Sequence, residues 1–176
     1  MEFQFKKCRI PDVIIVKKKY FPDNRGSLIK EYEFTPFLPM TGAPFLEEYI
    51  SISAENVLRG LHYQKEPKAQ GKLISVIKGE IFDVAVDIRK ESKTFLNSVV
   101  NIIISDSNES IWIPPGFAHG FLSLTEGSVV LNRCTNEIFP SLENGVLWND
   151  PAIDIVWPTK NPILSEKDGK WPLISK

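Results

Sequence analysis

Cysteine and histidine are both scarce in this chain, and each shortage excludes a kind of chemistry. The 176 residues include two cysteines, Cys8 and Cys134, and two histidines, His62 and His119. The cysteines are isolated thiols far apart in the sequence, so they form neither a disulfide framework nor a Cys-x-x-Cys redox or zinc motif. Two histidines cannot supply a three-histidine metal site. We therefore expect no metal and no cofactor.

Charge of one sign and long apolar runs are lacking as well. The net charge is −1, so the chain has no general basic field that would attract nucleic acid. The longest apolar runs fall well short of the ~20 residues that a membrane span requires. The first residues, Met1 to Arg9, lead into no long apolar segment of the kind found in a secretory signal. We expect a cytoplasmic protein that binds neither nucleic acid nor membranes.

Helical periodicity is also rare, and strand patterns take its place. The best short helical candidate is Ser165 to Asp168, near the end of the chain. Alternating or β-branched runs are frequent. They are Leu73–Lys78, Ile81–Ile88, Val99–Ile104 and Ser110–Ile113. The dipeptide Gly79-Glu80 between the first two runs predicts a hairpin.

The strand pattern and the length together predict the fold class. Apolar residues make up 43% of the chain, which is enough for one substantial core. Many short strands at regular spacing are typical of a sandwich or barrel. We expect an all-β protein, a double-sheet jelly roll with short helical elements near the C-terminus, formed as one domain over residues 1–176.

The most informative stretch runs from Val57 to Arg89. It places His62 between Arg59 and Lys72 and follows them with two strongly alternating strands. A histidine is the side chain most often used as a base near neutral pH, and the cations beside it can hold an anion. This stretch indicates proton chemistry on an anionic substrate.

Six motifs occur in a fixed order over nearly the whole chain. They are DNRG (23–26), RGLHYQ (59–64), QGKL (70–73), FDVAVDIRKES (82–92), WIPPGFAHGF (112–121) and WND (148–150). Together they resemble the dTDP-4-dehydrorhamnose 3,5-epimerase family. The resemblance implies a cupin-type jelly roll that acts on a nucleotide-linked 4-keto-6-deoxy sugar, most simply by converting dTDP-4-dehydro-6-deoxy-D-glucose to dTDP-4-dehydro-L-rhamnose at C3 and C5.

The resemblance also implies three catalytic roles. His62 would be the base, and Asp168, in the sequence LSEKD, would orient it. Lys72 would stabilise the enolate that forms when the carbon beside the ketone loses its proton. The bland alternatives are a core histidine and a solvated strand lysine, and the family motifs make the catalytic roles the better interpretation.

The remaining site residues are expected to bind the substrate. Arg59 and Arg25 match arginines assigned to the diphosphate, for which a guanidinium fork is suited. The other positions carried over from the family are Glu47, Tyr49, His119, Asn132, Glu143 and Lys167. The family's N-terminal strands cross to a neighbouring subunit, which would make this protein a homodimer and bring Arg25 into the partner's site.

Departures from the family cluster around the substrate. Asn132 stands where the family has the tyrosine acid opposite the base, and Ile138 replaces a second tyrosine. Leu28 replaces a common aromatic, and Lys30 stands where a glutamate is usual, although Glu31 is adjacent. The base of the nucleotide, the sugar and the number of inverted centres are therefore open from the sequence.

The residues leave three alternatives to this interpretation. A single-centre epimerase on another nucleotide sugar is one, and a non-catalytic sugar-nucleotide binding protein is another. A metal-dependent cupin is disfavoured because Gln64 stands where its His-x-His pattern needs a second histidine.

Tyr49 replaces a small amide of the family, so its phenol is either a substitute proton donor or merely a packed aromatic ring.

Overall fold

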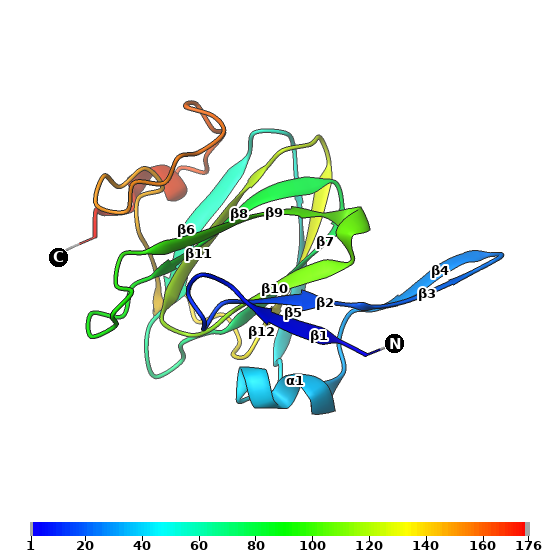
Figure 1. Ribbon diagram of the computed structural model, residues 1–176. Helices are drawn as coiled ribbons and strands as arrows, with labels where there is room; N and C mark the ends of the chain where they lie inside the picture. The colour runs from blue at the N-terminus through cyan, green and yellow to red at the C-terminus, as the bar shows by residue number, and fades with distance from the viewer. Residues whose placement is uncertain (1, 175–176) are drawn as a thin grey trace.

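Two antiparallel sheets face each other in the computed structural model, which describes residues 2–174 (Figure 1). The larger sheet contains, in spatial order, β1 (Gln4–Lys7), β2 (Ile14–Lys17), β10 (Glu109–Ile113), β7 (Lys72–Lys78), β12 (Ser128–Cys134) and β5 (Glu47–Ser53). The smaller sheet contains β13 (Glu143–Gly145), β6 (Leu58–Gln64), β11 (Phe117–Ser123), β8 (Glu80–Asp87) and β9 (Ser98–Ile104). The predicted all-β, double-sheet class is confirmed.

The main core lies between the inward faces of these sheets. Ile74 and Val76 of β7 pack in one buried cluster with Ile81 and Ala85 of β8 and with residues of five other strands and loops. Alternate residues of a strand point to opposite faces, so an apolar period of two fills the space between two sheets. This packing explains why the alternating runs of the sequence located the strands correctly.

The hairpin predicted at Gly79-Glu80 is wrong. β7 belongs to the larger sheet and β8 to the smaller one, so the chain crosses between the sheets at Gly79. Gly79 has a φ of +84°, and an added Cβ would lie 2.4 Å from the hydroxyl oxygen of Thr125. Alternation shows which face of a strand is buried but does not show which strand pairs with it. A tight glycine turn therefore fits a crossover as well as a hairpin.

The helix α1 (Phe34–Thr41) was missed by the sequence analysis. It is only eight residues long and contains Pro39, which removes one backbone donor. Its stability comes from tertiary packing, because Phe37 is fully buried against the rings of Phe3 and Tyr32. Of the helical elements predicted near the C-terminus, the described residues contain one 3-10 turn, η2 (Asp168–Lys170). A second 3-10 turn, η1 (Ser105–Ser107), joins β9 to β10.

A hairpin projects from the body of the molecule. It consists of β3 (Lys19–Asp23) and β4 (Gly26–Lys30), which pair only with each other among the described strands (Figure 1). Phe21 and Leu28 are 40% and 58% exposed on it. A two-stranded ribbon of this kind is marginal alone in water, so an apolar covering would stabilise it.

None of the helical segments between residues 2 and 174 has the length and apolar character needed to cross a membrane.

The motif FDVAVDIRKES builds an ion pair around a buried carboxylate at the end of β8. Asp87 is fully buried and accepts hydrogen bonds from Arg89 at 2.8 Å and from the hydroxyls of Ser92 and Thr94 at 2.6 Å. Burial alone would raise the pKa of Asp87, but these donors outweigh burial and hold that pKa well below its ordinary value. The carboxylate therefore stabilises the fold above pH ~4, and this contribution disappears as pH falls through the lowered pKa.

We expect Asp87→Asn to lower the free energy of unfolding at pH 7 by about 2 kcal/mol, because charged hydrogen bonds are replaced by neutral ones. The deficit relative to the parent protein should shrink at acid pH, where the parent carboxylate is itself protonated. Urea unfolding at several pH values measures both effects, with Asp106→Asn on exposed η1 as the control. A deficit that does not vary with pH would contradict a role for the charge.

Candidate active site

A cavity of about 310 Å³ lies between the two sheets and collects most of the residues singled out from the sequence. Nine of the eleven predicted site residues line it. They are Tyr49, Arg59, His62, Lys72, His119, Asn132, Glu143, Lys167 and Asp168. They come from β5, β6, β7, β11, β12, β13 and the C-terminal segment. Residues scattered over 120 positions of sequence thus share one small space.

Arg25 and Glu47 do not line this cavity. Arg25 lies at the tip of the β3–β4 hairpin, where its side chain is 86% exposed and paired with Asp23 at 2.5 Å. Glu47 lies two residues before Tyr49 on β5, on the same face of the strand, and accepts a hydrogen bond from the backbone N–H of Ile138 at 2.6 Å. Because Ile138 does line the cavity, Glu47 holds a wall residue in place without lining the cavity itself.

His62 and Asp168 form a hydrogen-bonded pair at one wall. Nε2 of His62 donates to Oδ1 of Asp168 at 2.5 Å, across 106 residues of sequence. Asp168 is only 4% exposed. Burial alone would raise the pKa of Asp168, but the hydrogen bonds from His62 and its neighbours bring that pKa below its ordinary value. The carboxylate therefore fixes the imidazole orientation and leaves Nδ1 with a free lone pair.

Asp168 reaches His62 because the C-terminal segment docks on β13. The Trp171 ring packs so closely on Gly145 that an added Cβ there would lie 2.4 Å from the ring. Gly145 is the register partner of His62, and the imidazole and the Trp171 ring lie edge to face with centroids 5.9 Å apart. Lys167 reinforces the docking through an ion pair with Glu143 at 2.5 Å. A glycine at position 145 thus lets the carboxylate approach the base.

Lys72 lies on β7, in the sheet that faces β6. Burial lowers the pKa of Lys72, while the Cys134 thiol and the carboxylates of Glu143 and Asp83 act in the opposite direction. Cys134 is its register partner on β12. A partly buried amine in such a wall can donate a strong hydrogen bond to an oxygen that becomes negative in the cavity.

The cavity also contains groups suited to an anion. The guanidinium of Arg59 donates to the hydroxyl of Ser53 at 3.0 Å and to the carbonyl oxygen of Ile52 at 3.1 Å, which fixes its direction. His119 lies opposite His62 in the β6–β11 register and bonds through Nε2 to buried Asp83 at 2.7 Å. These two side chains are therefore held in place before any ligand arrives.

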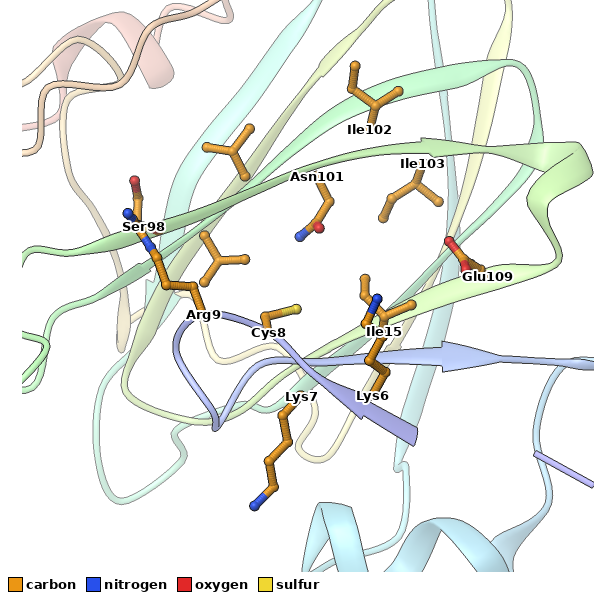
Figure 2. Close-up of a pocket in the computed structure, with 12 residues that line it drawn as sticks. Lys6, Lys7, Cys8, Arg9, Ile15, Ser98, Asn101, Ile102, Ile103 and Glu109 are labelled. Carbon is orange, nitrogen blue, oxygen red and sulfur yellow. Dashed lines mark hydrogen bonds between the residues drawn. The ribbon is translucent and has the colours of Figure 1, made fainter. Parts of the chain in front are cut away.

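A second and larger hollow of about 670 Å³ lies between β1 and β9 (Figure 2). Cys8 and Asn101 face each other across it, and burial raises the pKa of the Cys8 thiol. The side-chain nitrogen of Asn101 is buried and makes no hydrogen bond within residues 2–174. The hollow has lysines and an arginine but no imidazole, so it lacks the base that the smaller cavity offers.

Comparisons with known proteins agree with this geometry. Residues 7–176 match the family model described as dTDP-4-dehydrorhamnose 3,5-epimerase. A protein of that name from Salmonella typhimurium is 46% identical over 173 residues, covering 97% of this chain and 94% of that protein. The chain belongs to the dTDP-4-dehydrorhamnose 3,5-epimerase family.

Solved structures of family members share the fold over nearly the full length. The dTDP-6-deoxy-D-glucose-3,5-epimerase of Legionella pneumophila, in complex with dTDP-4-keto-L-rhamnose, is 36% identical with a TM-score of 0.93, covering 98% of this chain and 93% of that one. The Bacillus anthracis dTDP-4-dehydrorhamnose 3,5-epimerase with TDP and PPi bound is 37% identical with a TM-score of 0.94, covering 98% and 100%. The family resemblance read from the six motifs is confirmed.

Two residues at which this chain differs from the rest of its epimerase family lie next to each other in the structure. Asn132 on β12 and Tyr49 on β5 are direct register partners, and both line the cavity. Asn132 is 4% exposed, and its amide donates to the backbone oxygen of Val130 at 3.3 Å. The phenol and the amide therefore occupy neighbouring positions on the wall opposite His62.

The sequence analysis missed three residues that line the epimerase cavity. They are Ser51, Phe121 and Ser165. Ser51 lies two residues after Tyr49 on β5, so strand alternation could have placed it on the same face. Its hydroxyl oxygen is buried and makes no hydrogen bond with any residue from 2 to 174, which leaves it available to a ligand.

Proposed function

We propose that this protein epimerises dTDP-4-dehydro-6-deoxy-D-glucose to dTDP-4-dehydro-L-rhamnose by removing and returning protons beside the C4 ketone. The observation that carries the proposal is the His62–Asp168 pair facing Lys72 within one small cavity. A base, its orienting carboxylate and a cation opposite it are the parts that an enolate mechanism requires.

The proposed roles follow from the geometry of each group. Nδ1 of His62 accepts the proton from the sugar carbon, since Nε2 is engaged by Asp168. Asp168 stabilises the imidazolium that results, as a buried carboxylate does for a catalytic histidine. Lys72 donates to the C4 oxygen as it gains negative charge. The stabilisation by Lys72 is greatest in the transition state, so it accelerates the reaction instead of only tightening binding.

The anionic part of the substrate is assigned to three nitrogen-bearing side chains of the cavity. Arg59, His119 and Lys167 can contact the diphosphate, and a guanidinium can hold two phosphate oxygens at once. Glu143 and Asn132 line the same cavity and can bind the polar sugar or nucleoside atoms. Tyr49 contributes its phenol to this wall.

We also propose a cytoplasmic homodimer in which the N-terminal hairpin crosses to the partner. The exposed apolar residues Phe21 and Leu28 on the hairpin, and Ile50 and Ile52 on edge strand β5, support an interface there. Such a crossing would bring exposed Arg25 to the partner's diphosphate. Sedimentation equilibrium tests this proposal, and a monomer at micromolar concentration would contradict it.

Proton-exchange NMR in deuterated water tests the function. The enzyme is incubated with dTDP-, CDP- and GDP-linked 4-keto-6-deoxy sugars, and deuterium at C3 and C5 is followed over time. We expect exchange and inversion at both carbons of the dTDP-linked sugar. Absence of exchange with every sugar would indicate a binding protein without catalysis.

A single-centre epimerase is the second candidate, and one observation favours it. Asn132 cannot donate a titratable proton, so one of the two reprotonations could lack its donor. The same NMR experiment separates the candidates, because inversion at one carbon alone would identify a single-centre enzyme.

Catalysis should not depend on a metal ion. Within residues 2–174, no group of three or more His, Cys, Asp and Glu side chains is placed to hold a metal. We expect protein treated with EDTA and then dialysed to keep its full rate of epimerisation. A rate that falls on chelation and returns with zinc or iron would contradict this prediction.

A further inference from the structure

Inversion of a carbon requires two different proton carriers. A base that removes a proton from one face can return it only to that face, so the opposite face needs its own donor. Under the proposed function, His62 on β6 is the base. The second donor must therefore lie on the facing wall, which is built from β5, β7 and β12.

Four side chains of the cavity come from that wall. They are Tyr49, Ser51, Lys72 and Asn132. The Asn132 amide has no titratable proton, and the hydroxyl of Ser51 is far too weak an acid to transfer its proton. Lys72 is needed at the C4 oxygen. Tyr49 is the remaining group, and its phenol is an acid that can lose and regain a proton.

The surroundings of Tyr49 keep the phenol protonated at neutral pH. Burial raises the pKa of Tyr49 well above its ordinary value, and the Cys134 thiol and the carboxylates of Glu47 and Glu143 raise it further. Tyr49 is therefore in the correct state to give a proton but cannot act as the initial base.

The position of Tyr49 beside Asn132 allows the phenol to reach into the cavity. Directly opposed residues of antiparallel strands have Cβ atoms about 4.5–5.5 Å apart. The short Asn132 side chain is drawn back to the Val130 carbonyl, so it leaves space in front of β12. A long aromatic side chain on β5 can extend over this space.

We propose that Tyr49 is the catalytic acid that protonates the enolate on the face opposite His62, a role that rests on the proposed function. The C–H bond breaks toward Nδ1 of His62, and its electron pair forms the enolate with charge on the C4 oxygen. The phenol O–H bond then breaks as a new C–H bond forms on the other face, and the C4 carbonyl is restored. Exchange with solvent returns one proton to the phenolate and removes one from the imidazolium.

Tyr49→Phe in deuterated water tests the proposal, with the dTDP-linked 4-keto-6-deoxy sugar as the probe. We expect deuterium to enter the sugar at close to the parental rate, since His62 still forms the enolate and returns a deuteron to the face it left. Inversion should fall by about 10²-fold or more, which is the usual contribution of a general acid. Thermal unfolding is compared to show that the fold is kept.

Tyr32→Phe is the matched control, because Tyr32 packs on Phe37 and Phe45 outside the cavity. It should leave both exchange and inversion unchanged. Parental inversion in Tyr49→Phe would overturn the proposal, and so would equal loss of exchange and inversion, since Tyr49 would then act before the enolate. Failure of the proposed function is distinct, because the parent enzyme would show no exchange.

Discussion

His62→Ala should abolish deuterium exchange at the sugar carbons. The cavity holds one other histidine, His119, but its ring is bonded to buried Asp83 and lies on the anion-binding side. The carboxylate of Glu143 also lines the cavity, but it is paired with Lys167 at 2.5 Å, so His62 is the group best placed to remove the carbon proton. A general base typically contributes a factor of about 10² to 10⁴, so we expect the exchange rate to fall by about that factor.

The measurement is NMR of substrate incubated in deuterated water, which detects enolate formation even without inversion. His119→Gln is the matched control, and we expect it to raise KM while exchange continues at saturating substrate. Asp168→Asn should give an intermediate loss, because the amide still accepts from Nε2 but no longer stabilises the imidazolium. Exchange at the parental rate in His62→Ala would show that another group is the base.

Lys72→Met should have the second largest effect. Methionine keeps the length and apolar stem of lysine, so the packing on β7 is preserved while the donor to the C4 oxygen is removed. Loss of one preorganised donor of this kind costs about 10²–10³ in kcat. KM should change little, because the negative charge on the oxygen develops only as the proton leaves.

Lys78→Met provides the control for the second prediction. Lys78 lies at the exposed end of the same strand, outside the cavity. Steady-state kinetics and the exchange rate are measured for both variants, and Lys78→Met should match the parent. An increase in KM at constant kcat for Lys72→Met would mean that Lys72 binds the substrate without stabilising the enolate.

Several features of the fold could be predicted from local patterns. The alternating runs located β7, β8, β9 and β10, because side-chain direction along a strand has a period of two regardless of its partners. The same patterns could not assign β7 and β8 to different sheets, since partner choice depends on distant segments. The helix α1 was missed because Phe37 stabilises it through contacts with distant rings, while its own sequence contains Pro39.

The residues of the candidate site likewise include some that local motifs predict and some that only tertiary packing brings together. The residues of RGLHYQ and QGKL were identified from the sequence because each motif is local, and the family resemblance supplied Asp168 from a position 106 residues away. Residue patterns alone gave no sign that the C-terminal segment would dock on Gly145 and carry Asp168 to the imidazole. The approach of Asp168 to His62 depends on the packing of the Trp171 ring against Gly145, and this packing is a tertiary contact.

The sequence by itself determined the fold class and the family, since these depend on motifs and periods that are written along the chain, and it predicts His62 as the base. Only the tertiary structure decided that Tyr49 and Asn132 are register partners in one wall, that Glu47 bonds to the backbone of Ile138, and that Arg25 lies at an exposed tip. The physical reason is strand pairing. Register between distant strands sets which side chains share a cavity, and it is fixed by the packing of the whole core.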